Sequence, residues 1–205
     1  MNYYTSIGIV QDEIARLGEN YIIVSEGSNT MDIGRTILQN NRPLQRLDAG
    51  TFGTMGVGFG FAIAAQHLYP NKKVVMVVGD SAFGFSGMEL ETAARYHLPL
   101  KVVVINNNGI VMGVDEIEKD QTPKDISVLT LSPWAKYEQV AIALGGKGRA
   151  VNNHADLRSA MQEMLADDNM WVINCSINPI AGKKAQSFTW LTTSSDKAKE
   201  PEPKL

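Results

Sequence analysis

Oxygen-bearing side chains come shortly after two apolar runs of the sequence. Asp80 follows the run 73–78, and Asn107 follows the run 102–105, 27 residues beyond the aspartate. Gly109 can turn its backbone carbonyl toward the same point because no side chain intervenes. A carboxylate, a carboxamide and a carbonyl, without His or Cys, are ligands typical of Mg²⁺ or Ca²⁺ rather than of zinc. The pattern therefore predicts a site for a hard divalent cation.

A cation of this kind favours a ligand that carries phosphate groups. Mg²⁺ commonly shares its coordination shell with phosphate oxygens and water. Ser81 and Ala82 lie near the start of the helix expected after Asp80, where backbone N–H groups can bind an anion. A Gly-Asp turn or an Asn-rich loop alone would be ordinary scaffold. Because both follow strands, with a helix between them, they indicate a diphosphate-binding site.

The strands and helices that must position these residues alternate along the chain. Short apolar runs predict buried strands at 21–24, 73–78, 102–105 and 171–177. Helical spacing predicts helices at 5–17, 32–38, 59–68, 86–96, 134–144 and 155–166, and glycines predict a turn at 145–148. Together they predict an α/β fold, a mainly parallel sheet of about six strands with helices on both faces. In such a sheet, ligands bind at the carboxyl ends of the strands.

The length and composition predict one domain and a short tail. The chain has 205 residues, of which 44% are apolar, and we expect residues 1–191 to form a single domain. Residues 192–205 hold three Lys, three acidic residues and two Pro, which predicts a flexible C-terminal tail. The final Pro203-Lys204-Leu205 resembles the Ser-Lys-Leu class of peroxisomal signals, so the peroxisome is the expected location and the cytoplasm the alternative.

Some partners and sites are not expected. A net charge of −3 without a basic patch argues against nucleic acid, and no apolar run approaches the ~20 residues needed to cross a membrane. Cys175 is the single cysteine and lies in the apolar run 171–177, so we expect a buried strand thiol. The histidines show no metal-ligand spacing and are expected at the surface or at helix ends: His67, His97 and His154.

The glycine-rich segment 56–60 suggests a dinucleotide-binding loop as another interpretation. Its third required glycine would fall at Phe61, and the residues before Gly56 do not resemble a strand, so this hypothesis is weaker. The segment 145–148 lacks the earlier glycine of a phosphate-binding loop, because Ala141 stands at that position.

The residues of the predicted cation site also carry a resemblance to a known family. Gly79-Asp80-Ser81, with Asn107 27 residues after the aspartate, resembles the thiamine diphosphate signature that runs from Gly-Asp-Gly to Asn-Asn. Ser81 replaces the last glycine of the usual pattern. The string at 79–89 is similar to one branch, the 2-hydroxyacyl-CoA lyases and oxalyl-CoA decarboxylases. Further similar strings lie at 26–32, 47–56, 145–148 and 184–191, so the resemblance spans residues 3–191.

The resemblance implies which residues bind thiamine diphosphate and Mg²⁺. Asp80, Asn107 and the carbonyl of Gly109 would hold the ion. The Gly53 carbonyl would accept a hydrogen bond from the aminopyrimidine. Met55 would hold the two rings in a bent conformation that brings the pyrimidine amine close to the reactive thiazolium carbon. The other implied cofactor contacts are Ser28, Asn29, Ser81 and Ala82 at the diphosphate, and Ile110.

The resemblance also implies an activity and a partner domain. A 2-hydroxyacyl-CoA lyase cleaves the C1–C2 bond of its acyl-CoA thioester and releases formyl-CoA and a shortened aldehyde. In relatives the cofactor lies between domains of two subunits, and a glutamate on a pyrimidine-binding domain activates it. Nothing in this sequence resembles that domain. We therefore expect a homo-oligomer in which the same or a neighbouring subunit supplies the pyrimidine-binding domain, and no activity of the chain alone.

Two alternatives to this activity stay open. An oxalyl-CoA decarboxylase would share the same motifs. A non-catalytic binding or assembly module would keep the fold without the chemistry. Val111 is the main reason to consider the module, because the family commonly has a tyrosine at this position.

Overall fold

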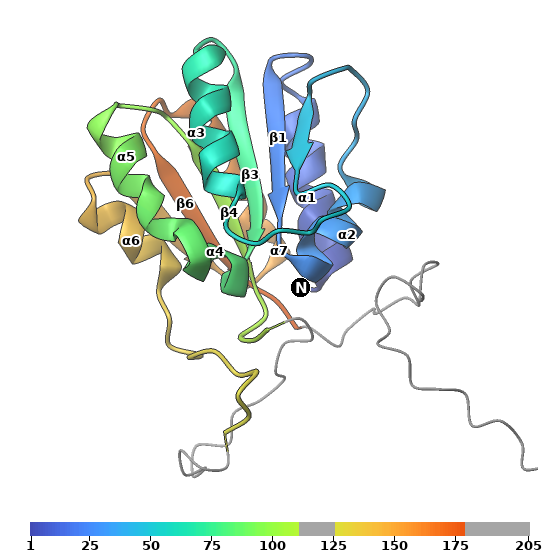
Figure 1. Cartoon of the computed structure of the whole chain (residues 1–205), viewed down its shortest axis with the longest axis vertical. Helices are drawn as coiled ribbons and strands as arrows, with labels where there is room; N and C mark the ends of the chain where they lie inside the picture. The colour runs from blue at the N-terminus through green and yellow to red at the C-terminus, as the bar shows by residue number, and fades with distance from the viewer. Residues whose placement is uncertain (111–125, 179–205) are drawn as a thin grey trace, which may run out of the picture.

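The computed structural model describes residues 1–110 and 126–178, and its centre is a six-stranded parallel sheet (Figure 1). The strand order is β2-β1-β3-β4-β6-β5, and every neighbouring pair is parallel. The strands are β1 Tyr21–Glu26, β2 Arg46–Asp48, β3 Lys73–Gly79, β4 Lys101–Asn106, β5 Lys147–Val151 and β6 Trp171–Ser176. The predicted α/β architecture is confirmed, and the predicted strands correspond to β1, β3, β4 and β6.

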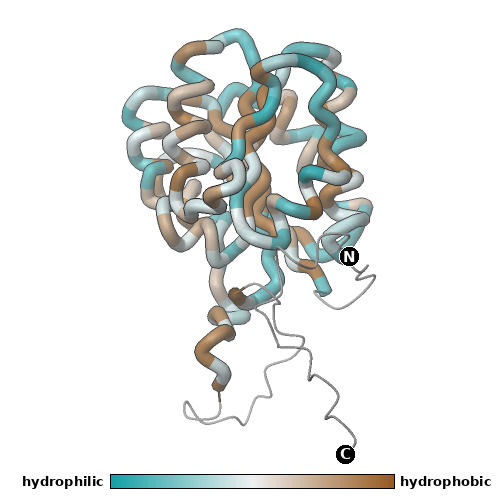
Figure 2. The backbone as a smooth tube through the Cα atoms, turned by 45° about the vertical axis from the view of Figure 1, so that its right-hand side comes forward, coloured by the Kyte–Doolittle hydropathy of each residue, from teal (hydrophilic) through white to brown (hydrophobic). Residues whose placement is uncertain are grey.

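Helices cover both faces of the sheet. On one face α1, α2 and α7 pack against Val75 and Val77 of β3, and on the other α3, α4, α5 and α6 pack against Val74, Met76 and Val78. This alternation follows from the two-residue period of a strand that is buried on both sides. Figure 2 shows hydrophobic residues concentrated along the strands, between the helical layers. The helices are α1 Tyr3–Ala15, α2 Ser28–Ile37, α3 Gly58–Leu68, α4 Asp80–Ser86, the short 3₁₀ helix η1 Gly87–Glu89, α5 Leu90–Arg95, α6 Tyr137–Ala143 and α7 His154–Ala166.

The edges of the sheet differ from the sequence-based expectation. β2 and β5 were not predicted, because β2 has three residues and β5 reads Lys-Gly-Arg-Ala-Val, so neither is an apolar run. An edge strand has a partner on one side only and keeps exposed positions. The predicted turn at 145–148 is wrong in its second half. Gly145 makes the turn with a φ of 88°, but Lys147 already pairs with Trp171 of β6.

The predicted helix boundaries also need correction. The helix expected at 86–96 begins one residue later, as η1 followed directly by α5, and the backbone of Ser86 (φ −145°, ψ 15°) separates it from the preceding helix α4. The next residue, Gly87, packs against the ring of Phe83, and a Cβ at this position would lie 2.4 Å from a ring carbon. α2 begins at Ser28 rather than at 32, and α6 begins at Tyr137 rather than at 134.

The register of β3 and β4 positions the predicted cation ligands. Val78 lies opposite Val104, and Gly79 lies opposite Ile105. The chain therefore leaves both strands at nearly the same level of the sheet. The segment between the strands returns through α4, η1 and α5, as a parallel crossover must. This geometry explains why residues 27 positions apart can meet at one edge.

Several further expectations can be compared with the fold. Within residues 1–110 and 126–178, no helix is long and apolar enough to cross a membrane. Cys175 is fully buried, and the three histidines at 67, 97 and 154 are exposed, as expected. Some predictions concern residues outside the described ranges: Val111, the string at 184–191, the tail 192–205 and its final Pro203-Lys204-Leu205.

Gly148→Ala tests the packing of β5 against α6. A Cβ on Gly148 would lie 2.3 Å from the backbone oxygen of Glu138, which cannot move aside like the end of a side chain. We expect this substitution to lower the free energy of unfolding by about 1–3 kcal/mol, measured by urea denaturation. Gly60→Ala in α3 is the control, because nothing lies within 4 Å of its Cβ, and the change should raise stability by at most about 1 kcal/mol. Equal stabilities of the two variants would contradict the packing.

Lys101 predicts a pH dependence of stability. Its side chain is fully buried at the start of β4, and Nζ donates to the carbonyls of Asp167, at 2.8 Å, and of Asn169. Burial lowers its pKa from 10.5 to about 8, and the positive charge of Lys73 acts in the same direction. Because the unfolded chain holds this proton more tightly, stability should rise between pH 8 and 10.5.

The measurement compares the wild type with Lys101→Met by urea denaturation at each pH. The unfolding free energy of the wild type should rise, relative to that of Lys101→Met, by up to about 3 kcal/mol over that range. A difference that does not change with pH would show that Lys101 keeps its ordinary pKa.

Candidate cofactor and metal site

A cavity of about 330 Å³ lies at the carboxyl ends of β1, β3 and β4. Of the ten residues predicted to bind the cofactor, nine line it, and Gly53 does not. The predicted residues that line the cavity are Ser28, Asn29, Met55, Asp80, Ser81, Ala82, Asn107, Gly109 and Ile110. Tyr3, Gly27, Thr30, Gly79 and Phe85 complete the lining. The fold therefore brings together segments that are far apart in the sequence.

Asp80 and Asn107 direct their oxygens to a common point. Asp80 begins α4, Asn107 directly follows β4, and each is only 3% exposed. The backbone N–H of Gly109 donates to Oδ1 of Asn107 at 3.0 Å and to Oδ2 of Asp80 at 3.3 Å. Both oxygens thus lie within 3.3 Å of one nitrogen atom. An ion that needs ligands from both loops can reach them together.

The buried charge of Asp80 fits a bound cation. Burial raises the pKa of Asp80 to about 6, although hydrogen bonds from the N–H groups of Ser81 and Gly109 oppose the shift. In the described part of the chain, no Lys or Arg forms an ion pair with this carboxylate. A buried carboxylate without a countercharge is costly, and a divalent ion would relieve that cost. Oxygen donors alone are the set that Mg²⁺ prefers.

Tyr3 orients Asn107, and the sequence analysis missed it. The Asn107 Nδ2 donates to the Tyr3 hydroxyl, so the carboxamide oxygen is turned toward the N–H of Gly109. Burial raises the pKa of Tyr3 to about 12, and the charge of Asp80 adds to the shift, so the phenol stays neutral. Tyr3 is 104 positions from Asn107 along the chain, and no local pattern connects two residues so far apart.

The loop between β1 and α2 packs closely on the start of α4. Gly27 has a φ of +96°, and a Cβ there would lie 3.2 Å from both Ala82 Cβ and the Gly79 nitrogen. Glycine is therefore required at this position. Beyond it, Ser28 and Asn29 open α2 and face the cavity. Both α2 and α4 begin at the cavity, where the free N–H groups of a helix start can bind a diphosphate.

The loop that carries Gly53 and Met55 is held from two sides. Arg35 forms a two-pronged ion pair with Asp48, in which Nε and Nη2 each lie 3.0 Å from a carboxylate oxygen. Nη2 of Arg35 also donates to the Gly50 carbonyl at 2.9 Å. At the other end of the loop, the N–H groups of Gly56 and Gly58 donate to the carboxylate of Glu26. The sequence analysis did not assign a role to either anchor.

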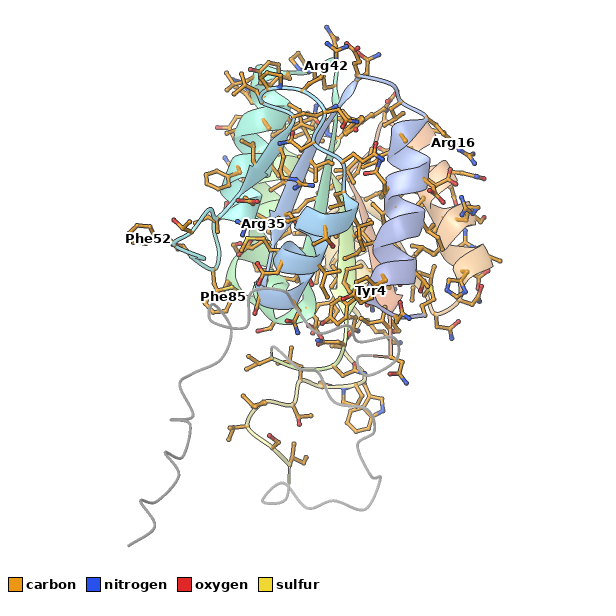
Figure 3. The ribbon with its side chains drawn as sticks, turned by 90° about the vertical axis from the view of Figure 1, so that its right-hand side faces the viewer. Tyr4, Arg16, Arg35, Arg42, Phe52 and Phe85 are labelled. Atoms are coloured by element: carbon orange, nitrogen blue, oxygen red, sulfur yellow. The ribbon has the colours of Figure 1, made fainter. Side chains whose placement is uncertain are left out.

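Gly53 lies farther out than Met55. Met55 is half-buried and lines the cavity, whereas Gly53 is exposed and has a φ of +61°. Beside them the structure exposes aromatic side chains: Phe52 is 94% exposed and Phe85, which lines the cavity, is 63% exposed. Figure 3 shows both phenylalanines projecting from the same side of the molecule. The cavity therefore has an exposed apolar side chain, that of Phe85, in its lining.

A later segment of the chain pairs with the loop after β4. The Ile110 N–H donates to the Leu129 carbonyl at 2.8 Å, and the Leu131 N–H donates to the Asn108 carbonyl at 2.9 Å. The sequence predicted no regular structure in this region. These bonds lie on both sides of Gly109, the third predicted metal ligand, and restrain the backbone around it.

Comparisons with known proteins place this chain among thiamine pyrophosphate enzymes. The family model described as "Thiamine pyrophosphate enzyme, C-terminal TPP binding domain" matches residues 26–175; thiamine pyrophosphate is another name for thiamine diphosphate. Human 2-hydroxyacyl-CoA lyase 1 is 50% identical over 95% of this chain, which covers 35% of that protein. Oxalyl-CoA decarboxylase of Escherichia coli K12 is 38% identical over 93% of this chain, and this chain covers 33% of the decarboxylase.

A solved structure shows the same fold. A thiamine diphosphate-dependent 4-hydroxybenzoylformate decarboxylase of Rhodococcus jostii RHA1 superposes with a TM-score of 0.71 over 87% of this chain, at 23% identity. This chain covers 33% of that structure and about a third of the curated relatives. The family model matches most of the chain, and the identity to the lyases extends over nearly all of it. The chain therefore belongs to the family of C-terminal thiamine pyrophosphate-binding domains and is homologous to the 2-hydroxyacyl-CoA lyases.

Proposed function

We propose that this chain is the Mg²⁺- and diphosphate-binding part of a thiamine diphosphate-dependent 2-hydroxyacyl-CoA lyase. The observation that carries the proposal is the convergence of the Asp80 and Asn107 oxygens on the N–H of Gly109. The higher identity to the human lyase than to the bacterial decarboxylase supports lyase activity over oxalyl-CoA decarboxylation.

Each predicted residue has a role in this proposal. Asp80, Asn107 and the Gly109 carbonyl hold Mg²⁺. The N–H groups of Ser28, Asn29, Ser81 and Ala82 bind the diphosphate. Met55 supports the ring system, the Gly53 carbonyl accepts from the aminopyrimidine, and Ile110 adds an apolar contact.

Thiamine diphosphate would supply, when bound, a nucleophilic thiazolium carbon and a cationic ring that accepts the electron pair of a cleaved carbon–carbon bond. The chain contributes binding and orientation. Among the residues lining the cavity, Tyr3 and Asp80 are the titratable ones in the described part of the chain. Burial raises the pKa of Tyr3 to about 12, so its phenol is neutral at physiological pH, and Asp80 is assigned to the ion. The proton transfer that activates the cofactor therefore requires a group from outside the described residues.

A pyrimidine-binding domain, from the same or a neighbouring subunit of a homo-oligomer, would supply the group that activates the cofactor. Two observations support this partner: the chain spans about a third of its relatives, and the cavity opens beside the exposed Phe52 and Phe85. Such a domain would cover the aromatic side chains and complete the site. The assembled enzyme would cleave the C1–C2 bond of a 2-hydroxyacyl-CoA and release formyl-CoA and an aldehyde.

Asp80→Asn should weaken cofactor binding without changing the shape of the site. We expect the affinity for thiamine diphosphate with Mg²⁺ to fall by about tenfold or more, since 1.4 kcal/mol already corresponds to a factor of about ten. Isothermal titration calorimetry measures the loss, and chelation of the metal should reproduce it in the wild type. Asp12→Asn is the control, because Asp12 is exposed and pairs with Arg158 on α7. Unchanged affinity of Asp80→Asn would exclude Asp80 as a ligand.

Activity should depend on the partner domain. The chain with thiamine diphosphate, Mg²⁺ and a 2-hydroxyacyl-CoA should release no formyl-CoA, and adding the remaining part of the human lyase as a separate polypeptide should restore release. Chromatography of the CoA products measures both. Turnover by the chain alone would contradict the need for an outside group. Turnover of oxalyl-CoA but not of the 2-hydroxyacyl-CoA would favour the decarboxylase.

A further inference from the structure

Glu26 is a buried carboxylate that lies between the two loops flanking the cavity. It is the last residue of β1 and is only 1% exposed. Gly27 and Ser28, which follow it directly, line the cavity between β1 and α2. Its side chain contacts the other loop, which carries Met55. Glu26 therefore connects two loops: its backbone continues into the loop after β1, and its side chain binds the loop that carries Met55.

Both carboxylate oxygens of Glu26 are used by the second loop. The Gly56 N–H donates to Oε1, and the Gly58 N–H donates to Oε2 at 2.8 Å. α3 begins at Gly58, and the residue before it, Val57, provides no side-chain cap. Glu26 therefore satisfies the free N–H group of Gly58 at the start of α3 and places a negative charge at the positive end of the helix dipole.

The packing leaves no room for another arrangement. A Cβ on Gly58 would lie 2.4 Å from Oε2 of Glu26 and 2.7 Å from Cε of Met76. Gly56 has a φ of +88°, and a Cβ there would lie 3.3 Å from Cβ of Phe85, which lines the cavity. The loop is therefore fixed against β1 at one point and against α4 at another, directly after Met55.

The charge of Glu26 is balanced by the backbone alone. Burial raises its pKa, and the N–H groups of Gly56, Gly58 and Val57 act against that shift. In the described part of the chain no Lys or Arg forms an ion pair with it. Each oxygen accepts a hydrogen bond from a loop N–H group, and Glu26 is not among the residues that line the cavity. Glu26 acts on the site only through the loop.

We infer that Glu26 is a positioning residue for the ring system of the cofactor. It fixes Met55 and the Gly53 carbonyl relative to Ser28, and so sets the separation between the ring site and the diphosphate site. The inference rests on the proposed function. Glu26→Gln keeps the shape but leaves one acceptor oxygen, so one loop N–H would face the amide nitrogen, which is itself a donor.

The test compares two ligands that share the diphosphate but differ in the rings. Binding of thiamine diphosphate and of inorganic diphosphate, each with Mg²⁺, is measured by calorimetry on the 205-residue chain. For Glu26→Gln we expect about a tenfold loss for thiamine diphosphate and less than about a twofold loss for inorganic diphosphate. Glu138→Gln is the matched control. Glu138 is another buried glutamate, on α6, and its carboxylate accepts a hydrogen bond from Nδ2 of Asn174 at 2.9 Å. This substitution should change neither affinity.

A second pair of variants covers the case in which Glu26→Gln does not fold. Gly58→Ala pushes a methyl group toward the same carboxylate and should show the same selective loss, whereas Gly60→Ala, two residues further along α3, should not. Equal losses for both ligands, or none, in the variant that folds would overturn the inference alone. A wild-type chain that binds thiamine diphosphate no better than inorganic diphosphate would overturn it too. A wild-type chain that binds neither ligand would overturn the proposed function as well.

Discussion

The site depends on the parallel register of β3 and β4 at the centre of the sheet. Gly79 lies opposite Ile105, so the chain leaves the two strands at nearly the same level. Both strands are buried on their two faces by helices, which fixes this level. The position of Asp80 relative to Asn107 is therefore set by the most tightly packed part of the molecule. The loops before α2 and α3 are then fitted around this pair.

The sequence predicted the centre of the sheet because its strands are continuous apolar runs. The spacing of Asp80 and Asn107 was interpretable for the same reason, since parallel strands end at one edge. β2 and β5 escaped prediction, because a strand with one partner needs no apolar run. The predicted turn over Lys147 failed because the glycines there serve close packing against α6 as well as the change of direction.

The residues that support the site were not predictable from local patterns. Tyr3 and Glu26 act through contacts with residues 104 and 30 positions away, and such contacts follow from the arrangement of elements in space. Glu26 belonged to a string that resembled the family, but the resemblance does not say what its side chain touches. The predicted ligands nevertheless line one cavity, apart from Gly53. Most of the residues predicted to bind the cofactor follow strand ends, whereas the residues that hold them in place come from distant parts of the chain.

The hydrogen bonds from the N–H of Gly109 have a consequence for affinity. They gather the carboxylate of Asp80 and the carboxamide of Asn107 in the folded chain itself. The side-chain entropy lost in bringing these groups together is thus lost on folding, not when a ligand arrives. Such preorganisation raises the fraction of the binding energy that appears as affinity. It also holds two lone-pair donors near one nitrogen atom, so part of the folding stability is given up for the ability to bind a cation.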